Sequence, residues 1–207
     1  NDFKAVGDCG YSLFTTGGSV AFKNLLKRQN EQCDEMVFSI QCEQYSVVNP
    51  LNVNYGNRCT GGSMWNNYLP NPHFVESFEA SDGTPFEWDN YCPGYSTMTP
   101  LQRSVFFLRD GMTQAEIDKM QTYGADMSKY LPAGNEERIR KAYEDRDPRL
   151  MMSIITPYST YLGSAGGEAH TYTLRWPYRG VDGREPFDIR TDANNYFYYL
   201  WRKFVPE

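Results

Sequence analysis

The chain has 207 residues, a formal net charge of −6 and 22% charged residues. Together with 40% hydrophobic residues, this composition excludes a wholly disordered chain and a coiled coil, and the scattered Lys and Arg argue against nucleic acid as the main ligand. No apolar run is long enough to predict a membrane-spanning helix. Aromatic residues reach 15% beside 17 Gly and 12 Pro, a mixture typical of loop-rich binding surfaces.

The first third of the chain predicts two helices, a strand and a long loop. Residues 1–10 have the pattern of the end of a helix that a glycine closes. Residues 19–29 place apolar side chains on one helical face, with Ser19 as the expected N-cap. Residues 35–42 alternate apolar and polar side chains and predict a half-buried strand. Residues 46–72 combine Gly, Asn and Pro with embedded aromatics, which favours a functional loop.

Turn and capping signals divide the middle of the chain. The Asn-Pro pair at 71–72 predicts the start of a short helix over 73–80, because proline is tolerated in the first turn. The Asp-Gly pair at 82–83 predicts a turn, and residues 84–88 then predict a short extended segment.

Two further helices have clear start and stop signals. Thr113 and Glu116 have the spacing of a capping box, and the helix that they open is expected to end before Gly124. The segment 135–144 (NEERIRKAYE) predicts the second of these helices.

Residues 145–150 (DRDPRL) predict a rigid corner. Pro148 disfavours helical backbone at Asp147, so the preceding helix must stop there. Asp147 can accept hydrogen bonds from the backbone, and the arginines beside it can form planar pairs with carboxylates. The segment offers no nucleophile or base, which favours a structural role. Strands are expected over 150–156, 169–178 and 196–204. The chain is therefore predicted to be α+β and loop-rich.

The cysteines carry no recognisable metal or redox motif. They lie at positions 9, 33, 42, 59 and 92, and no two form a C-x-x-C pair. A bridge such as Cys59–Cys92 stays open as an alternative to buried thiols.

The DRDPRL corner and the apolar segment after it resemble the hallmark of the SusD/RagB family of outer-membrane glycan-binding lipoproteins. Three more segments resemble family patterns in family order: 34–41 (DEMVFSIQ), 71–86 (NPHFVESFEASDGTPF) and 199–205 (YLWRKFV). None is specific alone, but together they cover the chain from about residue 3 to 205. Family members are considerably longer, so the chain resembles an internal piece of one.

The resemblance implies a segment of a SusD-like fold. Residues 1–30 would be the tail of a tetratricopeptide-like helical scaffold, and 31–207 a ligand-binding region truncated at its C-terminus. The implied function is non-catalytic binding of a glycan or oligosaccharide on the outward face of the outer membrane of a Bacteroidetes-type bacterium. The implied partner is a SusC-like TonB-dependent transporter, and a lipid anchor outside the sequence would attach the protein. No enzymatic activity, cofactor, metal or nucleic-acid partner is expected.

Sugar recognition needs flat apolar rings for the C–H face of a pyranose, with amides around them for the hydroxyl groups. The segment 61–68 (GGSMWNNY) supplies this combination. Trp65 and Tyr68 are predicted to stack on the sugar, and Asn66 and Asn67 to contact its hydroxyl groups. The alternative is that Trp65 folds back to cover the core.

Two further aromatic pairs are candidate ligand-binding residues. Trp88 and Tyr91 flank two polar residues, although the alternating pattern before them also suits rings that pack inward. Tyr158 and Tyr161 follow an apolar segment and precede a glycine-rich loop. The aromatic run that contains Trp201 is interpreted instead as core or interface.

The competing class is a glycoside hydrolase, which needs two carboxylates on either side of a sugar. The available carboxylates have spacings that select no pair: Glu76, Glu79, Asp82, Glu87 and Asp89. A calcium site could use Asp188, Asp192 and Asn194. These residues lack the fixed spacing of an EF-hand loop, so solvated turn residues are the favoured interpretation.

Overall fold

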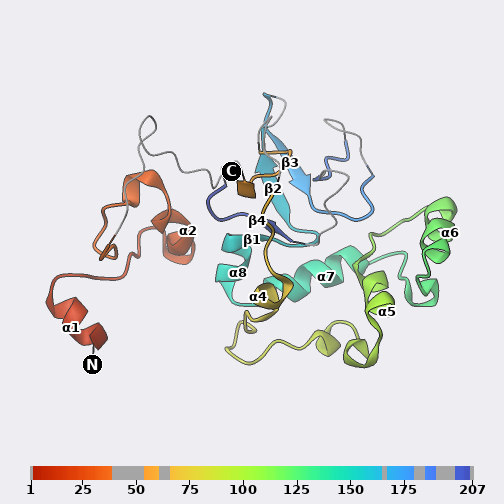
Figure 1. The fold of residues 1–207 in the computed structure, drawn as a ribbon, viewed down its shortest axis with the longest axis horizontal. Coiled ribbons are helices and arrows are strands. Elements are labelled where there is room, and N and C mark those ends of the chain that lie inside the picture. Colours follow the sequence, from red (N-terminus) through yellow and green to blue (C-terminus); the bar gives the residue numbers. More distant parts are fainter. Residues whose placement is uncertain are drawn as a thin grey trace.

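The fold is taken from a computed structural model, which describes residues 2–38, 54–60, 66–164, 167–179, 185–189 and 199–205. Among these residues, helices outnumber strands, the strands are short, and long loops connect these elements (Figure 1). The predicted α+β, loop-rich architecture is therefore confirmed. In the described part of the chain, no helix is both long and apolar enough to cross a membrane.

The helices of the described residues are short. The α-helices are α1 (Asp2–Asp8), α2 (Ala21–Leu25), α4 (Pro72–Glu76), α5 (Pro100–Ser104), α6 (Gln114–Thr122), α7 (Asn135–Glu144) and α8 (Pro148–Ser153). Between them lie single turns of 3₁₀ helix: η1 (Gly18–Val20), η2 (Arg28–Asn30), η3 (Trp88–Asn90), η4 (Tyr95–Thr97), η5 (Val105–Phe107) and η6 (Met127–Lys129).

Two small antiparallel sheets complete the described fold. Strand β1 (Ile154–Ile155) pairs with β4 (Leu200–Trp201), with Ile154 opposite Trp201. Strands β2 (Thr160–Gly163) and β3 (His170–Thr173) form a hairpin in which Tyr161 lies opposite Tyr172. The first pairing brings the end of the chain back to the end of α8.

The core consists of three hydrophobic clusters. The first joins α4, η3, η5 and α7, and includes Val75, Trp88, Phe107, Ile139 and Tyr143. The second lies under both sheets and includes Cys59, Ile155, Tyr161, Tyr172 and Leu200. The third lies between η5 and α6 and consists of Val105, Leu108, Met112 and Met120. Cys59 and Cys92 lie in different clusters, so the Cys59–Cys92 bridge is not formed.

The two helices with clear sequence signals form as predicted. Thr113 and Glu116 make a complete capping box at the start of α6, and each satisfies a backbone N–H at the helix end. Helix α7 spans the whole predicted segment. The N–H groups at its start are bound by a residue far away in the sequence. The Asp110 carboxylate accepts from the backbone N–H of Gly134 and Asn135 at 2.8 Å each.

The DRDPRL corner turns the chain between α7 and α8. Asp147 has extended ψ (124°) and accepts a hydrogen bond from Arg149 N at 2.9 Å, so it is the N-cap of α8 with Pro148 in the first turn. The Arg149 guanidinium also pairs with the Asp147 carboxylate. The rigid corner predicted from the sequence is confirmed.

Several predicted elements differ from the structure. Residues 148–153 are helical rather than extended, because the Asp147 cap and Pro148 start a helix, and only Ile154–Ile155 form a strand there. Residues 35–38 are turns with Val37 and Phe38 mostly exposed, so they are not part of a half-buried strand; 39–42 lie outside the described residues. Residues 84–87 join no sheet.

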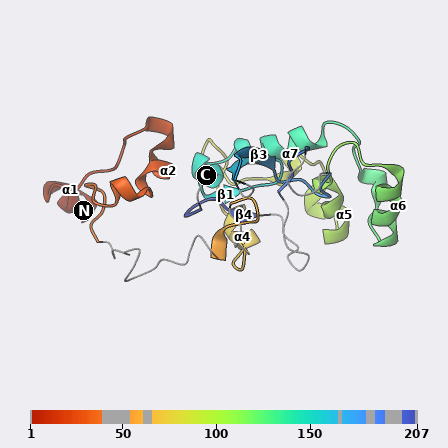
Figure 2. The same ribbon diagram turned by 90° about the horizontal axis from the view of Figure 1, so that it is seen from above.

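The N-terminal helices lie at one end of the molecule (Figure 2). Helix α2 contacts α8, and the Lys203 ammonium lies 5.0 Å from the centre of the Phe22 ring. Ser19 is not an N-cap, because it lies inside η1 and α2 begins only at Ala21. The side chains of residues 11–20 are almost all exposed.

Candidate functional site

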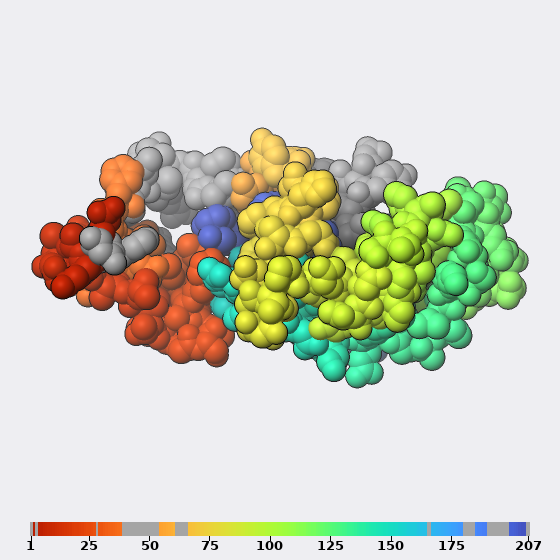
Figure 3. Space-filling model, turned by 90° about the horizontal axis from the view of Figure 1, so that it is seen from below, coloured from red at the N-terminus to blue at the C-terminus, as the bar shows by residue number. Residues whose placement is uncertain are grey.

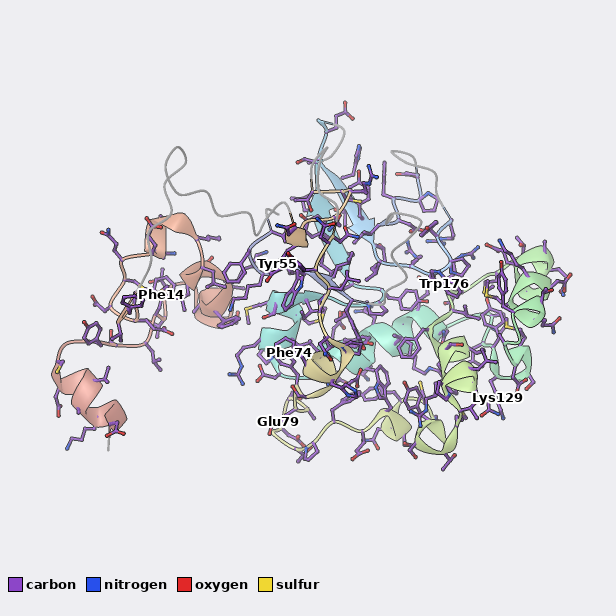
Figure 4. All side chains as sticks on the ribbon, in the orientation of Figure 1. Phe14, Tyr55, Phe74, Glu79, Lys129 and Trp176 are labelled. Carbon is purple, nitrogen blue, oxygen red and sulfur yellow. The ribbon has the colours of Figure 1, made fainter. Side chains whose placement is uncertain are left out.

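Four aromatic rings from three separate parts of the chain form a continuous row. Tyr68 meets Tyr55 edge to face with ring centroids 5.9 Å apart, and Tyr55 stacks on Trp201 at 5.2 Å with an interplanar angle of 25°. Trp201 lies 6.2 Å from Phe74 in a tilted arrangement. We call Tyr68, Tyr55, Trp201 and Phe74 the aromatic row. Figure 4 labels Tyr55 and Phe74 near the middle of the molecule, and the gold segment around residue 75 lies at the surface in Figure 3.

The two ends of the aromatic row are open to solvent. Tyr68 is 58% exposed and Phe74 is 45% exposed, whereas Tyr55 and Trp201 between them are half-buried. Large exposed rings that pack against other rings are held in place at little entropic cost. They therefore offer preformed apolar faces to a ligand.

Backbone hydrogen bonds fix Tyr68 and its neighbour Asn67. Tyr68 N donates to Asn54 O at 3.2 Å, and Asn66 N donates to Gly56 O at 2.9 Å. The two segments thus run side by side. The exposed Asn67 amide donates to Asn54 Oδ1 at 3.0 Å, so two side-chain amides are joined between the segments that carry Tyr55 and Tyr68.

The segment 54–60 lies directly on the β2–β3 hairpin. Ser164 N donates to Cys59 O at 2.9 Å. A side chain at Gly163 would place its Cβ 2.3 Å from Cys59 O, so only glycine allows this approach. The hairpin therefore sets the position of Tyr55.

Phe74 is positioned by the anchoring of α4 at both ends. Asn71 Oδ1 accepts from His73 N at 2.8 Å as the N-cap. At the other end, the buried guanidinium of Arg146 donates to the carbonyl oxygens of Val75, Glu76 and Phe78 at 2.9–3.0 Å. The Val75 carbonyl also accepts from Phe78 N, whereas Glu76 O and Phe78 O lie past the last turn of the helix, so Arg146 supplies the donors that the missing turn would have provided.

Trp201 is carried by β4. Its strand pairs with β1, and Arg202 N donates to Ser153 O at 2.9 Å just beyond it. Trp201 Nε1 is buried and has no hydrogen-bond partner among the described residues. The ring is therefore held by packing rather than by its polar atom.

The predicted segment 61–68 is only partly described. Tyr68 and Asn67 lie on the exposed surface beside each other. Asn66 is 1% exposed with a left-handed φ of 38°, so its side chain points into the protein and does not face a ligand on this surface. Trp65 lies outside the described residues.

The other predicted aromatics are not surface platforms. Trp88, Tyr158 and Tyr161 are 9%, 3% and 1% exposed because they fill the core, so the structure does not place these predicted ligand-binding residues on an open surface. Tyr91 is half-buried, with its ring stacked on Phe86 and its hydroxyl donating to Asp145 Oδ2 at 2.7 Å. The pKa of Tyr91 is raised to about 12, mainly by burial and secondly by this hydrogen bond.

Three of the carboxylates considered for hydrolysis accept hydrogen bonds within the protein, and one of them, Asp89, accepts from Ser96 N at 3.1 Å. Glu76 accepts from Trp88 Nε1 at 2.7 Å and from the Tyr199 hydroxyl at 2.8 Å. Asp82 accepts from Thr84.

A metal site also lacks support. Among the described residues, no group of three His, Cys, Asp or Glu side chains is arranged to hold a metal ion. Asp188, from the predicted calcium cluster, pairs with Arg175 Nη1 at 2.6 Å; Asp192 and Asn194 lie outside the described residues.

Sequence reasoning missed most of the aromatic row. Tyr55 and Phe74 were not predicted as site residues, and Trp201 was interpreted as core or interface. Tyr55 and Tyr68 both lie in the loop 46–72 that the sequence predicts to be functional, but only Tyr68 lies in the amide-rich segment selected for the site. No local pattern marks Phe74 or Trp201, because tertiary packing alone brings β4 against the segments 54–60 and 72–76.

Comparisons with known proteins point to one family. The family described as the SusD family matches residues 25–207. A SusD-like protein from Bacteroides fragilis NCTC 9343, known from a crystal structure, is 14% identical in sequence to this chain. The match covers 98% of this chain and 36% of that protein, with a TM-score of 0.47. The chain thus spans about a third of that protein's length. No curated protein matches the sequence. Because the family match extends over most of the residues, the chain belongs to the SusD family.

Proposed function

We propose that this protein binds a glycan without altering it chemically, and that the aromatic row with the Asn54–Asn67 amide pair is the binding surface. The observation that carries the proposal is the exposed ring of Tyr68, held edge to face on Tyr55, next in the chain to the exposed Asn67, whose amide is bonded to Asn54. Membership of the SusD family, which suggests glycan binding in nutrient uptake, supports it.

The chemistry of the surface suits a sugar. The C–H face of a pyranose is apolar and packs on an aromatic ring, while its hydroxyl groups both donate and accept hydrogen bonds. An amide side chain also carries donors and an acceptor. Tyr68 and Phe74 would provide the packing faces, and Asn67 the polar contact at the edge.

The proposed lack of catalysis is supported by the position of the carboxylate that lies nearest to the row in the sequence. Glycoside hydrolysis needs an acid and a second carboxylate that both reach the scissile bond. The nearest described carboxylate along the chain, Glu76, is held by Trp88 and Tyr199 on the side of α4 toward the core. The surface is therefore suited to binding alone.

The wider setting is also proposed from the family. The bound oligosaccharide would pass to a SusC-like TonB-dependent transporter at the outward face of the outer membrane of a Bacteroidetes-type bacterium, where a lipid anchor would hold the protein. Residues 1–30 would belong to the helical scaffold and 31–207 to the ligand-binding region. Trp65 stays a prediction from the sequence.

The test is glycan binding by the purified protein, measured by affinity electrophoresis over a panel of polysaccharides and then by calorimetry. Tyr68→Ala is expected to weaken binding at least tenfold, since a sugar-stacking ring contributes about 1.4 kcal/mol or more. Tyr123→Ala is the matched control, because Tyr123 is 68% exposed at the C-terminus of α6, which lies at the end of the molecule away from α4 and β4. Circular dichroism verifies that both variants fold.

Two outcomes would overturn the proposal. Equal binding by wild type, Tyr68→Ala and Asn67→Ala would place the site elsewhere. Release of reducing ends during incubation with a bound polysaccharide would show that the protein is a hydrolase.

A further inference from the structure

The segment that builds most of the aromatic row is almost free of charged residues. Between Glu43 and Glu76, 32 consecutive residues contain Arg58 as the only Asp, Glu, Lys or Arg. At the chain average of 22% charged residues, a stretch of this length would contain about seven. The lack of charge is therefore local and does not reflect a weakly charged protein.

Amides take the place of charges in this segment. Seven of the 14 asparagines of the chain lie between Glu43 and Glu76. In the described part, Asn67 is exposed beside Tyr68 and is bonded to Asn54, while Asn71 caps α4 just before Phe74. The polar groups along the aromatic row are thus mostly neutral groups that both donate and accept.

The charged side chains of α4, the DRDPRL corner and the residues directly after β4 interact with other groups of the protein. The Glu76 carboxylate accepts two hydrogen bonds from side chains. Arg146 is 1% exposed, and Arg202 Nη2 donates to Thr160 O. The Lys203 ammonium lies over the Phe22 and Phe204 rings. Arg58 is exposed but makes its own contacts within the protein.

We propose that the ligand of this surface is a neutral glycan rather than one that carries uronate or sulfate groups. The inference rests on the proposed function and adds the charge class of the substrate. Anionic sugars are recognised by arginine or lysine, which form charge-assisted and often bidentate hydrogen bonds. Neutral hydroxyl groups need no such cation and match amide side chains.

The experiment compares neutral and anionic polysaccharides under the same conditions. Soluble starch, galactomannan and xyloglucan are the neutral probes, and polygalacturonate and chondroitin sulfate are the anionic ones. Calorimetry is run with wild type, Tyr68→Ala and Tyr123→Ala at low and at high NaCl. We expect wild type to bind at least one neutral probe, with a Kd that changes less than about twofold with salt because no ion pair is screened. Tyr68→Ala should lose this binding, and Tyr123→Ala should keep it.

The possible failures are distinct. Binding only to an anionic probe, weakened by salt and lost in Tyr68→Ala, would overturn the neutral class while the proposed binding surface stands. Binding to a neutral probe that Tyr68→Ala leaves unchanged would overturn the proposed surface. Binding to neither set would contradict both inferences.

Discussion

Removal of the Arg146 guanidinium should destabilise the protein more than any change at the neighbouring Arg149. Arg146 is 1% exposed and its side chain makes four hydrogen bonds to the carbonyl oxygens of Val75, Glu76 and Phe78. Its guanidinium carbon also lies 4.0 Å from the centre of the Phe86 ring. Arg149 lies three residues further on, with its side chain 62% exposed.

The magnitude follows from the groups left behind. Arg146→Ala leaves the carbonyl oxygens of Glu76 and Phe78 without a donor, at about 1–3 kcal/mol each, and removes the side chain that packs on the Phe86 ring. Part of this loss is offset, because the variant no longer has to desolvate a charged group. We expect a net decrease of about 3–5 kcal/mol in the free energy of unfolding, a large share of the ~5–15 kcal/mol typical of a domain. Arg149→Ala removes an exposed ion pair and should cost less than about 1 kcal/mol.

Urea unfolding followed by tryptophan fluorescence measures the difference. With an m-value of about 2 kcal/mol per molar, Arg146→Ala should lower the midpoint by about 2 M urea. Arg146→Lys covers the case in which the alanine variant does not fold. Lysine keeps the charge, but its single ammonium cannot reach all three carbonyls, so about half of the loss is expected.

The reasoning would be refuted by equal stability across the series. If the free energies of unfolding of Arg146→Lys and Arg146→Ala both lie within about 1 kcal/mol of that of Arg149→Ala, the hydrogen bonds from Arg146 do not hold the corner and α4 together.

Three further predictions concern close packing, tyrosine ionisation and thiol reactivity. Gly163→Ala forces the hairpin away from Cys59 and should cost about 1–3 kcal/mol in urea unfolding, whereas Gly7→Ala, with nothing within 4 Å, should cost nothing. Burial raises the pKa of Tyr91 to about 12 and that of Tyr143 well above its ordinary value. The folded state therefore retains phenolic protons that the unfolded state releases near pH 10, so the free energy of unfolding should fall as pH rises above about 10; a flat profile in urea unfolding would contradict this. Burial also raises the pKa of Cys92 to about 11, so iodoacetamide near neutral pH should label exposed Cys9 first, as mass spectrometry of the peptides would show. Faster labelling of Cys92 would show that this part of the core opens.

Elements with local signals could be predicted from the sequence. The capping box of Thr113 and Glu116 and the full extent of α7 depend on residues within a few positions of one another. The DRDPRL corner was also predictable, but the helix after it was not. The apolar run after Pro148 suits either a strand or a helix, and the Asp147 cap decides for a helix.

The candidate site was harder to predict than the fold, because its rings meet only through tertiary packing. Tyr68 could be found from its own loop, whereas Phe74 shares an ordinary short helix with the buried Val75. Trp88 and Tyr161 have equally suggestive neighbours in the sequence and are nevertheless core residues. Which ring remains exposed depends on what packs over it, and a single sequence does not contain that information directly.

The position of Trp201 on the last described strand has a consequence for the order of folding. Tyr55 and Phe74 leave the ribosome long before β4, and contacts between distant segments form late because closing a long loop costs entropy. Until β4 pairs with β1, the inner faces of both rings lack their partner and are exposed to other chains. We therefore expect the rings that would hold a ligand in the folded protein to be exposed to other chains until β4 has been synthesised and has paired with β1.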